Sequence, residues 1–133
     1  MTRRSIVVSG LGHGSSPIPT ASVVGQLLVS GSVSGVDRST GNVPPELAAQ
    51  VRNLFGNVRA VVETAGGSID DIVKLTFFVP DRSARAEIDP VWCETFPDPD
   101  SRPARHVAVY RDLPAGLLLQ CEVIAHIAKP SED

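Results

Sequence analysis

The run Ile72–Val79 restricts the possible fold more than any other stretch of the chain. It is apolar on both alternating faces except at Lys74 and Thr76, and Pro80 ends it. A strand that is apolar on both faces lies in the interior of a sheet, with other structure packed against each side. The preceding Ser68–Asp71 fits a capping box, with aspartate in place of the usual glutamate, and predicts one short helical turn. We therefore expect a sheet built around this central strand.

Two segments have the periodicity of helices that could cover such a sheet. Between Pro44 and Ala65 the apolar residues recur at helical spacing on one stripe, and Gly66–Gly67 supplies a stop. This stripe consists of Leu47, Val51, Leu54, Val58, Val62 and Ala65. The second predicted helix is Ser83–Phe96, in which Pro90 predicts either a kink or a helix that begins near Ile88.

Four further runs are predicted strands. They are Ser5–Ser9, Gln26–Val33, Ala104–Arg111 and Leu117–Ile127, and the last two are expected to be neighbours joined by a turn. The resulting order of strands and helices predicts an α+β fold, with a mixed sheet and both helices packed on one face. Leu11–Ala21 is rich in glycine, serine and proline, and we expect an ordered, functional loop there.

The overall composition suits an ordinary globular domain. The chain has 133 residues, of which 42% are hydrophobic and 20% charged, and it shows no repeat or linker. We expect a single domain over residues 1–133, with 1–4 and 128–133 frayed. A net charge of -3 without any basic run argues against nucleic-acid binding. No signal-peptide pattern or membrane-spanning apolar run occurs, so the expected location is the cytoplasm.

The two cysteines do not indicate a metal site. Cys93 and Cys121 lie far apart in apolar surroundings, and no cluster of cysteine and histidine has the spacing of metal ligands. We expect both to be buried free thiols, and we expect no bound metal.

The other face of the sheet is left without cover if both helices pack on one side. Alternation along the last predicted strand places a mixed set of large apolar and polar residues on that face. These residues are Leu118, Gln120, Glu122, Ile124 and His126. A mixed face of this kind suits a subunit interface, so we predict a closed homo-oligomer packed through it.

Two ionisable residues interrupt the apolar pattern of the last two predicted strands. Arg105 lies at the start of one and Glu122 in the middle of the other, and a buried charge needs a partner. Glu122 could form a structural ion pair with Arg105 or Lys74. Alternatively, the two residues form a site, because a guanidinium binds carboxylates through paired hydrogen bonds and a poorly solvated carboxylic acid can transfer protons near neutral pH. The residues themselves leave both alternatives open.

Three other residues are weaker candidates. Gly31 interrupts a predicted strand, which indicates a bulge or a close approach by ligand or backbone. His13 lies in the glycine-rich loop and could reach a ligand, although loop histidines are usually just solvated. His106 points to the face opposite Arg105 and is expected to pack or to face solvent.

Several motifs together resemble one family. They are Val29-Ser30-Gly31, the stretch Glu63–Lys74, Arg102-Pro103-Ala104-Arg105, Leu113-Pro114-Ala115-Gly116 and Cys121-Glu122-Val123-Ile124-Ala125. From about Ser16 to Ile127 the chain resembles the reactive intermediate deaminase family (Rid, or YjgF-type).

The resemblance implies a chorismate-mutase-like homotrimer with sites at the subunit clefts. Family members hydrolyse enamines and imines such as 2-aminoacrylate to a keto acid and ammonia, without a cofactor. By the same resemblance, Arg105 clamps the substrate carboxylate and Glu122 positions the attacking water. Ser30 and Gly31 line the pocket, and the backbone at Val107 faces it.

The chain departs from the family pattern at three pocket positions. Ile18 replaces a tyrosine, Val107 replaces a common cysteine, and Asp89 replaces a common asparagine. The retained Arg105 and Glu122 favour retained chemistry, on a different, larger or more apolar substrate. The alternatives are a 2-aminomuconate-type deaminase and a non-catalytic trimer that binds small carboxylates or acts like a chaperone. A ribonuclease activity is disfavoured by the acidic charge.

Overall fold

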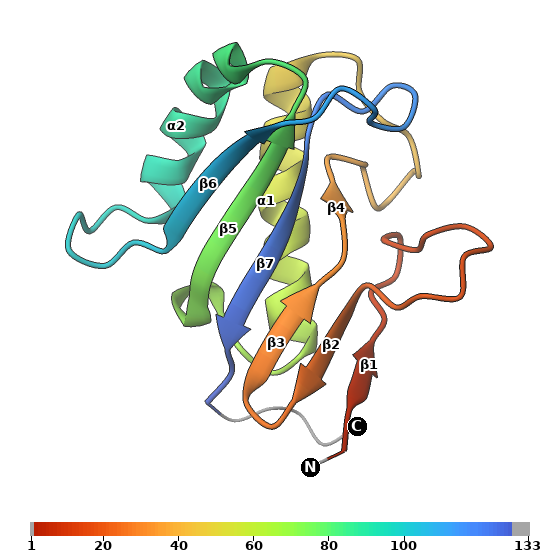
Figure 1. The fold of residues 1–133 in the computed structure, drawn as a ribbon, viewed down its shortest axis with the longest axis vertical. Coiled ribbons are helices and arrows are strands. Elements are labelled where there is room, and N and C mark those ends of the chain that lie inside the picture. Colours follow the sequence, from red (N-terminus) through yellow and green to blue (C-terminus); the bar gives the residue numbers. More distant parts are fainter. Residues whose placement is uncertain (1, 129–133) are drawn as a thin grey trace.

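A computed structural model describes residues 2–128 of the chain. Within this range seven strands form one mixed sheet in the order β1-β2-β3-β7-β5-β6, with β4 also paired to β7 (Figure 1). The strands are β1 (Arg4–Ile6), β2 (Ala21–Val24), β3 (Leu27–Ser30), β4 (Val33–Ser34), β5 (Ile72–Val79), β6 (Ala104–Val109) and β7 (Gln120–His126). The β5–β6 pair is parallel and the other pairs are antiparallel.

Both long helices lie on the same face of the sheet, behind it in Figure 1. They are α1 (Leu47–Thr64) and α2 (Arg85–Thr95), and each of the short turns η1 (Ile69–Asp71) and η2 (Arg82–Ala84) precedes the next long element. Ser68 and Asp71 form the expected capping box around η1. The predicted α+β class, with a mixed sheet and two helices on one face, is confirmed.

The central position of β5 is also confirmed, with the bounds that the sequence predicts. Its neighbours are β6 on one side and β7 on the other. Leu75, Phe77 and Val79 face the helices and are completely buried, whereas Lys74 and Thr76 lie half-buried on the face without helices. Below, this second face is called the open face of the sheet.

The N-terminal half of the sheet differs from the prediction. The predicted strand Gln26–Val33 is divided into β3 and β4. The sequence does not predict β2, because this short strand directly follows the proline-rich loop. A hairpin joins β2 to β3, with Val24 paired to Leu27 around Gly25 and Gln26. Gly25 has a φ of 58°, which fits glycine at the first central position of a type II′ turn. The first strand is likewise shifted and begins at Arg4, which pairs with Val23, so residues 1–4 are not all frayed.

The expected pairing of the last two strands is wrong, because β5 lies between β6 and β7. The crossover through α2 places β6 parallel to β5 at the sheet edge. The segment after β6 then passes over the end of β5 and lets β7 pair on its other side (Figure 1). Leu117–Leu119 precede β7 instead of belonging to it.

Two details of α2 also differ. Pro90 lies inside the helix, which begins at Arg85 and not near Ile88. A proline removes one helical hydrogen bond, and α2 tolerates this because Ile88 and Trp92 are buried against the core. Cys93 follows Trp92 on the outer side and is exposed, so only Cys121 is a buried thiol.

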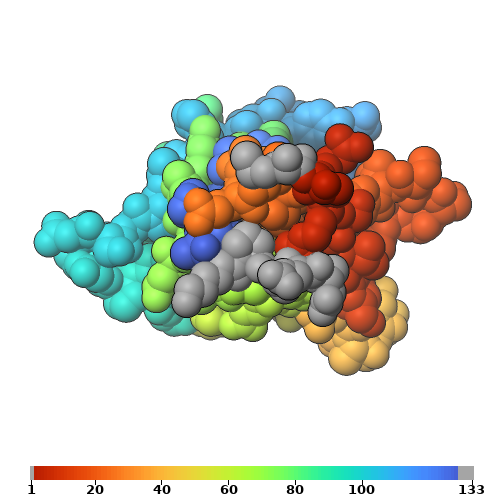
Figure 2. Space-filling model, turned by 90° about the horizontal axis from the view of Figure 1, so that it is seen from below, coloured from red at the N-terminus to blue at the C-terminus, as the bar shows by residue number. Residues whose placement is uncertain are grey.

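Two loops extend from this layered body at opposite ends. In Figure 2 the loop before β2 (orange-red) projects on one side and the turn between α2 and β6 (cyan) on the other. The expected frayed tail beyond Ala128 lies outside the described residues.

Candidate functional site

Arg105 lies on the helix-covered face of the sheet. Its position on β6 is paired with Leu75, which faces the helices. The guanidinium lies 5.0 Å from the ring centroid of Trp92, and its Nη1 donates to Oδ1 of Asp89 at 2.8 Å. The Arg105 side chain is only 23% exposed. A guanidinium carries five N–H donors, so a pair that uses one of them leaves others for an anion.

Glu122 lies on the other face. It is paired with Thr76 on the open face of the sheet and is half-buried there. The ion pairs among residues 2–128 are Arg52–Glu94, Arg59–Glu63 and Arg105–Asp89. The alternative of an ion pair between Glu122 and Arg105 or Lys74 is therefore wrong for this part of the chain. A site that uses both Arg105 and Glu122 needs more than one protomer, because the sheet separates them.

A pocket of about 340 Å³ opens beside the N-terminal loop. Its walls come from residues 11–18, from residues 32–36, from the loop 114–117 and from Gln120 of β7. Of the predicted site residues Ile18 lines this pocket, and the residue is 55% exposed. A neighbouring hollow of about 260 Å³ shares Ser32 and Gln120 with it and adds two aromatic residues, Phe78 and Tyr110.

Ser30 and Gly31 form a bulge beside this pocket. Val29 pairs with Ile124 and Val33 with Cys121, so β3 and β4 have one residue more than the β7 segment opposite. Ser30 Oγ donates to the Gly31 carbonyl at 2.7 Å and accepts from the Val123 N–H at 2.8 Å. The bulge alternative for Gly31 is thus confirmed. The buried Ser30 side chain links the bulge to β7.

The N-terminal loop is attached to the sheet through Thr20. This buried hydroxyl accepts from the Val8 N–H at 3.2 Å and donates to the Leu11 carbonyl at 3.4 Å. The Thr20 carbonyl accepts from the N–H of Gly31 at 3.0 Å. His13 lies in the same loop and forms part of the pocket wall. Its Nε2 is buried and has no hydrogen-bond partner among residues 2–128.

The amide side chains of Gln50, Asn53 and Asn57 on α1 bind two other walls of the pocket, the 114–117 loop and the segment 34–36. The fully buried Gln50 donates to the carbonyls of Pro44 at 2.8 Å and Gly116 at 2.9 Å, and accepts from the Leu118 N–H at 2.9 Å. It therefore ties the 114–117 loop to the start of the helix.

Asn53 and Asn57 do the same for the segment that follows β4. Asn53 donates to the Gly35 carbonyl at 3.1 Å. Asn57 donates to the carbonyls of Ser34 at 2.8 Å and Val36 at 2.9 Å. Sequence reasoning missed these residues, although amides at positions i, i+3 and i+7 of an otherwise apolar helix face were a readable signal.

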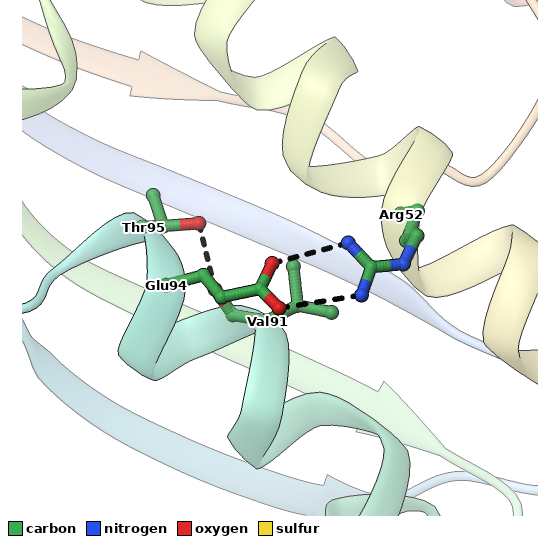
Figure 3. A network of polar contacts seen from close by, with 4 residues as sticks. All are labelled: Arg52, Val91, Glu94 and Thr95. Carbon is green, nitrogen blue, oxygen red and sulfur yellow. Dashed lines mark hydrogen bonds and ion pairs between the residues drawn. The ribbon is translucent and has the colours of Figure 1, made fainter.

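An exposed ion pair links the two helices. Arg52 of α1 donates from Nη1 and Nη2 to the two carboxylate oxygens of Glu94 on α2, at 3.1 and 3.4 Å (Figure 3). Hydrogen bonding to the guanidinium lowers the pKa of Glu94 and raises that of Arg52. Glu94 and Asp89 are both residues of α2, but they pair with different arginines. The Arg52–Glu94 pair therefore does not involve Arg105.

The remaining chemistry-bearing residues do not form a further centre. Within residues 2–128 no group of three His, Cys, Asp or Glu side chains could hold a metal ion, and no helix is both long and apolar enough to cross a membrane. Burial raises the pKa of the Cys121 thiol, so the thiolate is strongly disfavoured. Val107 is half-buried on the Arg105 side of β6, away from the pocket.

The fold and motifs of this chain match those of one known family. The family described as "Endoribonuclease L-PSP" matches residues 19–127. The chain belongs to this family, the Rid or YjgF-type family. An Escherichia coli relative named "2-iminobutanoate/2-iminopropanoate deaminase" is 34% identical over 103 residues, which cover 77% of this chain and 80% of that protein. A RutC family protein of Pyrococcus horikoshii is 32% identical over 75% of this chain and 78% of that protein.

Solved Rid structures have the same fold. The YjgF gene product of Escherichia coli has a TM-score of 0.83 at 30% identity, over 92% of this chain and 98% of that chain. A Rid family protein of unknown function from Yersinia pestis has a TM-score of 0.86 at 25% identity, over 95% of this chain and all of that chain. The similarity therefore extends over almost the whole domain.

Proposed function

We propose that this Rid family member is a cofactor-independent deaminase that hydrolyses carboxylate-bearing enamines and imines to a keto acid and ammonia. The observation that carries the proposal is the fixed guanidinium of Arg105, held between the Trp92 ring and the Asp89 carboxylate. A half-buried, preorganised arginine with free donors is suited to anchor a small carboxylate. The deaminase names of relatives at about one-third identity support the same reaction class.

The complete site, in this proposal, is assembled from two protomers of a homotrimer. Arg105 lies on the helix-covered face of the edge strand β6, whereas the pocket with Ile18 does not include it, so neither is sufficient alone. The open face carries exposed apolar side chains, including Leu27 at 52% and Val29 at 40% exposure, as expected of a surface that another copy covers. In the proposal, the cleft lies where the open face of one copy meets the edge strand β6 of its neighbour, which carries Arg105.

The roles of the residues then follow from imine chemistry. A protonated imine is already electrophilic, so hydrolysis needs an anchored substrate and an oriented water molecule. In the proposal Arg105 binds the carboxylate, Glu122 orients the water, and the Gly31 bulge and the Val107 backbone border the cleft. Ile18 in the pocket wall favours a substrate with an apolar side chain over 2-aminoacrylate itself.

The direct test is ammonia release from 2-iminobutanoate or 2-aminoacrylate generated in the assay, measured against spontaneous hydrolysis. Arg105→Ala should lower the catalysed rate at least about tenfold, because a charge-assisted bidentate contact contributes about 1.5–3 kcal/mol. Arg59→Ala is the matched control, since Arg59 forms an exposed pair with Glu63 on the far helix. Size measurement of each variant separates loss of the trimer from loss of the anchor.

Other outcomes would assign the protein to another class. If the wild type releases no ammonia from a panel of imino acids and 2-aminomuconate, the proposed activity is refuted. Tight keto-acid binding without turnover would then indicate a binding module. Cleavage of RNA is disfavoured by the net charge of -3, and incubation with single-stranded RNA checks it.

A further inference from the structure

We propose that His13 is a catalytic residue of the pocket, and that it moves the protons which imine hydrolysis requires. This inference rests on the proposed function and adds a residue to it. The first observation is the composition of the pocket wall. Its other lining residues contribute aliphatic groups, hydroxyls, backbone and one amide, so His13 is the titratable side chain among them.

The second observation is that His13 has no evident structural task. A histidine kept for stability normally forms hydrogen bonds through its ring nitrogens. Here Nε2 is enclosed without a partner among residues 2–128, a situation that opposes stability and is typical of functional positions. His13 itself lies in the wall of the pocket.

The third observation is that the backbone on both sides of His13 is held by hydrogen bonds. The N–H of Ser16 donates to the His13 carbonyl at 3.2 Å and closes a turn. Leu11, two residues earlier, is bound to the buried Thr20 hydroxyl. A Cβ added at Gly31 would lie 3.9 Å from Nε2, so this end of the imidazole lies close to the bulge. A fixed general acid or base has little orientational freedom to lose during reaction.

The bulge also places His13 near the strand that carries Glu122. Residues 30–32 lie opposite Glu122 and Val123 of β7, between the two registered pairs that flank the bulge. Gln120, two positions along the same face of β7, lines the pocket with His13. A water molecule oriented from β7 would therefore approach a substrate on the side where His13 lies.

The proposed steps balance as follows. Water adds to the carbon of the iminium, a C–O bond forms, and neutral imidazole takes one proton from the water to give the carbinolamine. The imidazolium then protonates the amine nitrogen and the C–N bond breaks. The hydroxyl proton leaves with the ammonia as ammonium, and the keto acid and neutral imidazole remain. No oxidant, reductant or metal enters the sequence.

The test is the kinetics of His13→Gln and His13→Ala in the full-length protein with 2-iminobutanoate. We expect kcat to fall about 10²-fold or more with little change in KM, and one limb of the pH–rate profile to disappear. Added imidazole should restore part of the activity of His13→Ala. Ser15→Ala is the control, because Ser15 is exposed in the same loop and does not line the pocket.

The alternative outcomes are distinct. An unchanged kcat, a rise in KM alone, or an unaltered pH profile in His13→Gln would overturn the assignment of His13 while leaving the deaminase proposal in place. An inactive wild type refutes the deaminase proposal itself. A folded, trimeric His13→Ala that imidazole does not rescue would also count against proton transfer.

Discussion

Replacement of Asp89 by asparagine should increase the affinity of the protein for carboxylate substrates. Asp89 Oδ1 lies 2.8 Å from Nη1 of Arg105, so the anchor is partly neutralised before a substrate arrives. A substrate carboxylate on the far side of the guanidinium would lie roughly 6 Å from Asp89. Two unit charges at that distance repel by about 0.7 kcal/mol in water and about 3 kcal/mol at an effective dielectric constant of 20.

Because Asp89 is exposed to solvent, the expected repulsion between it and a substrate carboxylate is close to the value in water. Its side chain is 56% exposed, and solvent-screened pairs contribute at most about 1 kcal/mol. Asp89→Asn should therefore lower KM, and the Kd of a stable keto acid, about fivefold while kcat stays constant. The amide can still accept a hydrogen bond from Arg105, so the geometry of the anchor is kept.

The assay is calorimetric binding of 2-oxobutanoate together with steady-state ammonia release. Glu94→Gln is the matched control, because it weakens the other arginine–carboxylate pair of α2 without touching Arg105 (Figure 3). If Asp89→Asn leaves affinity unchanged or weakens it, Asp89 serves to position Arg105 and the electrostatic reasoning is wrong.

Two further predictions concern stability and thiol chemistry. Gly56→Ala should stabilise the protein by up to about 1 kcal/mol in urea unfolding, because a Cβ there meets nothing within 4 Å inside a helix. Gly35→Ala should destabilise it, because its Cβ would overlap the Gln50 backbone; equal effects of the two changes would contradict this. A thiol reagent should modify one cysteine of the native protein, Cys93, and should reach Cys121 only after unfolding, since burial raises the pKa of the Cys121 thiol. Rapid modification of both thiols in the native state would show that the core opens readily.

The elements that follow from local pattern are predictable from this sequence. The bounds of β5 follow from its two apolar faces and from Pro80, and α1 follows from its apolar stripe. By contrast, β2 begins directly after a proline-rich loop, and its four residues carry too little alternation to stand out. The hairpin at Gly25 becomes clear only when its partner strand is known.

The order of the strands depends on pairing between distant segments, which one sequence does not reveal. Arg105 and Glu122 belong to strands that both pair with β5, and their registers place them opposite Leu75 and Thr76. Adjacent residues of β5 point to opposite faces, so the two candidates are separated by the sheet. The sequence therefore predicts which residue types the candidate site contains. It does not predict which of these residues lie together in the pocket of one protomer.

The pocket walls differ in how firmly they are attached to the rest of the domain, and this difference determines where substitutions can change the pocket. The segment 34–36 and the loop 114–117 are bound to amides of α1, so substitutions there disturb the helix as well as the pocket. The loop that carries His13 and Ile18 is joined to the sheet mainly through Thr20 and main-chain hydrogen bonds. Substitutions within this loop can reshape the cavity at small thermodynamic penalty. A change in substrate preference during evolution is therefore expected to accumulate between residues 14 and 18, while His13 and the helix-bound walls stay as they are.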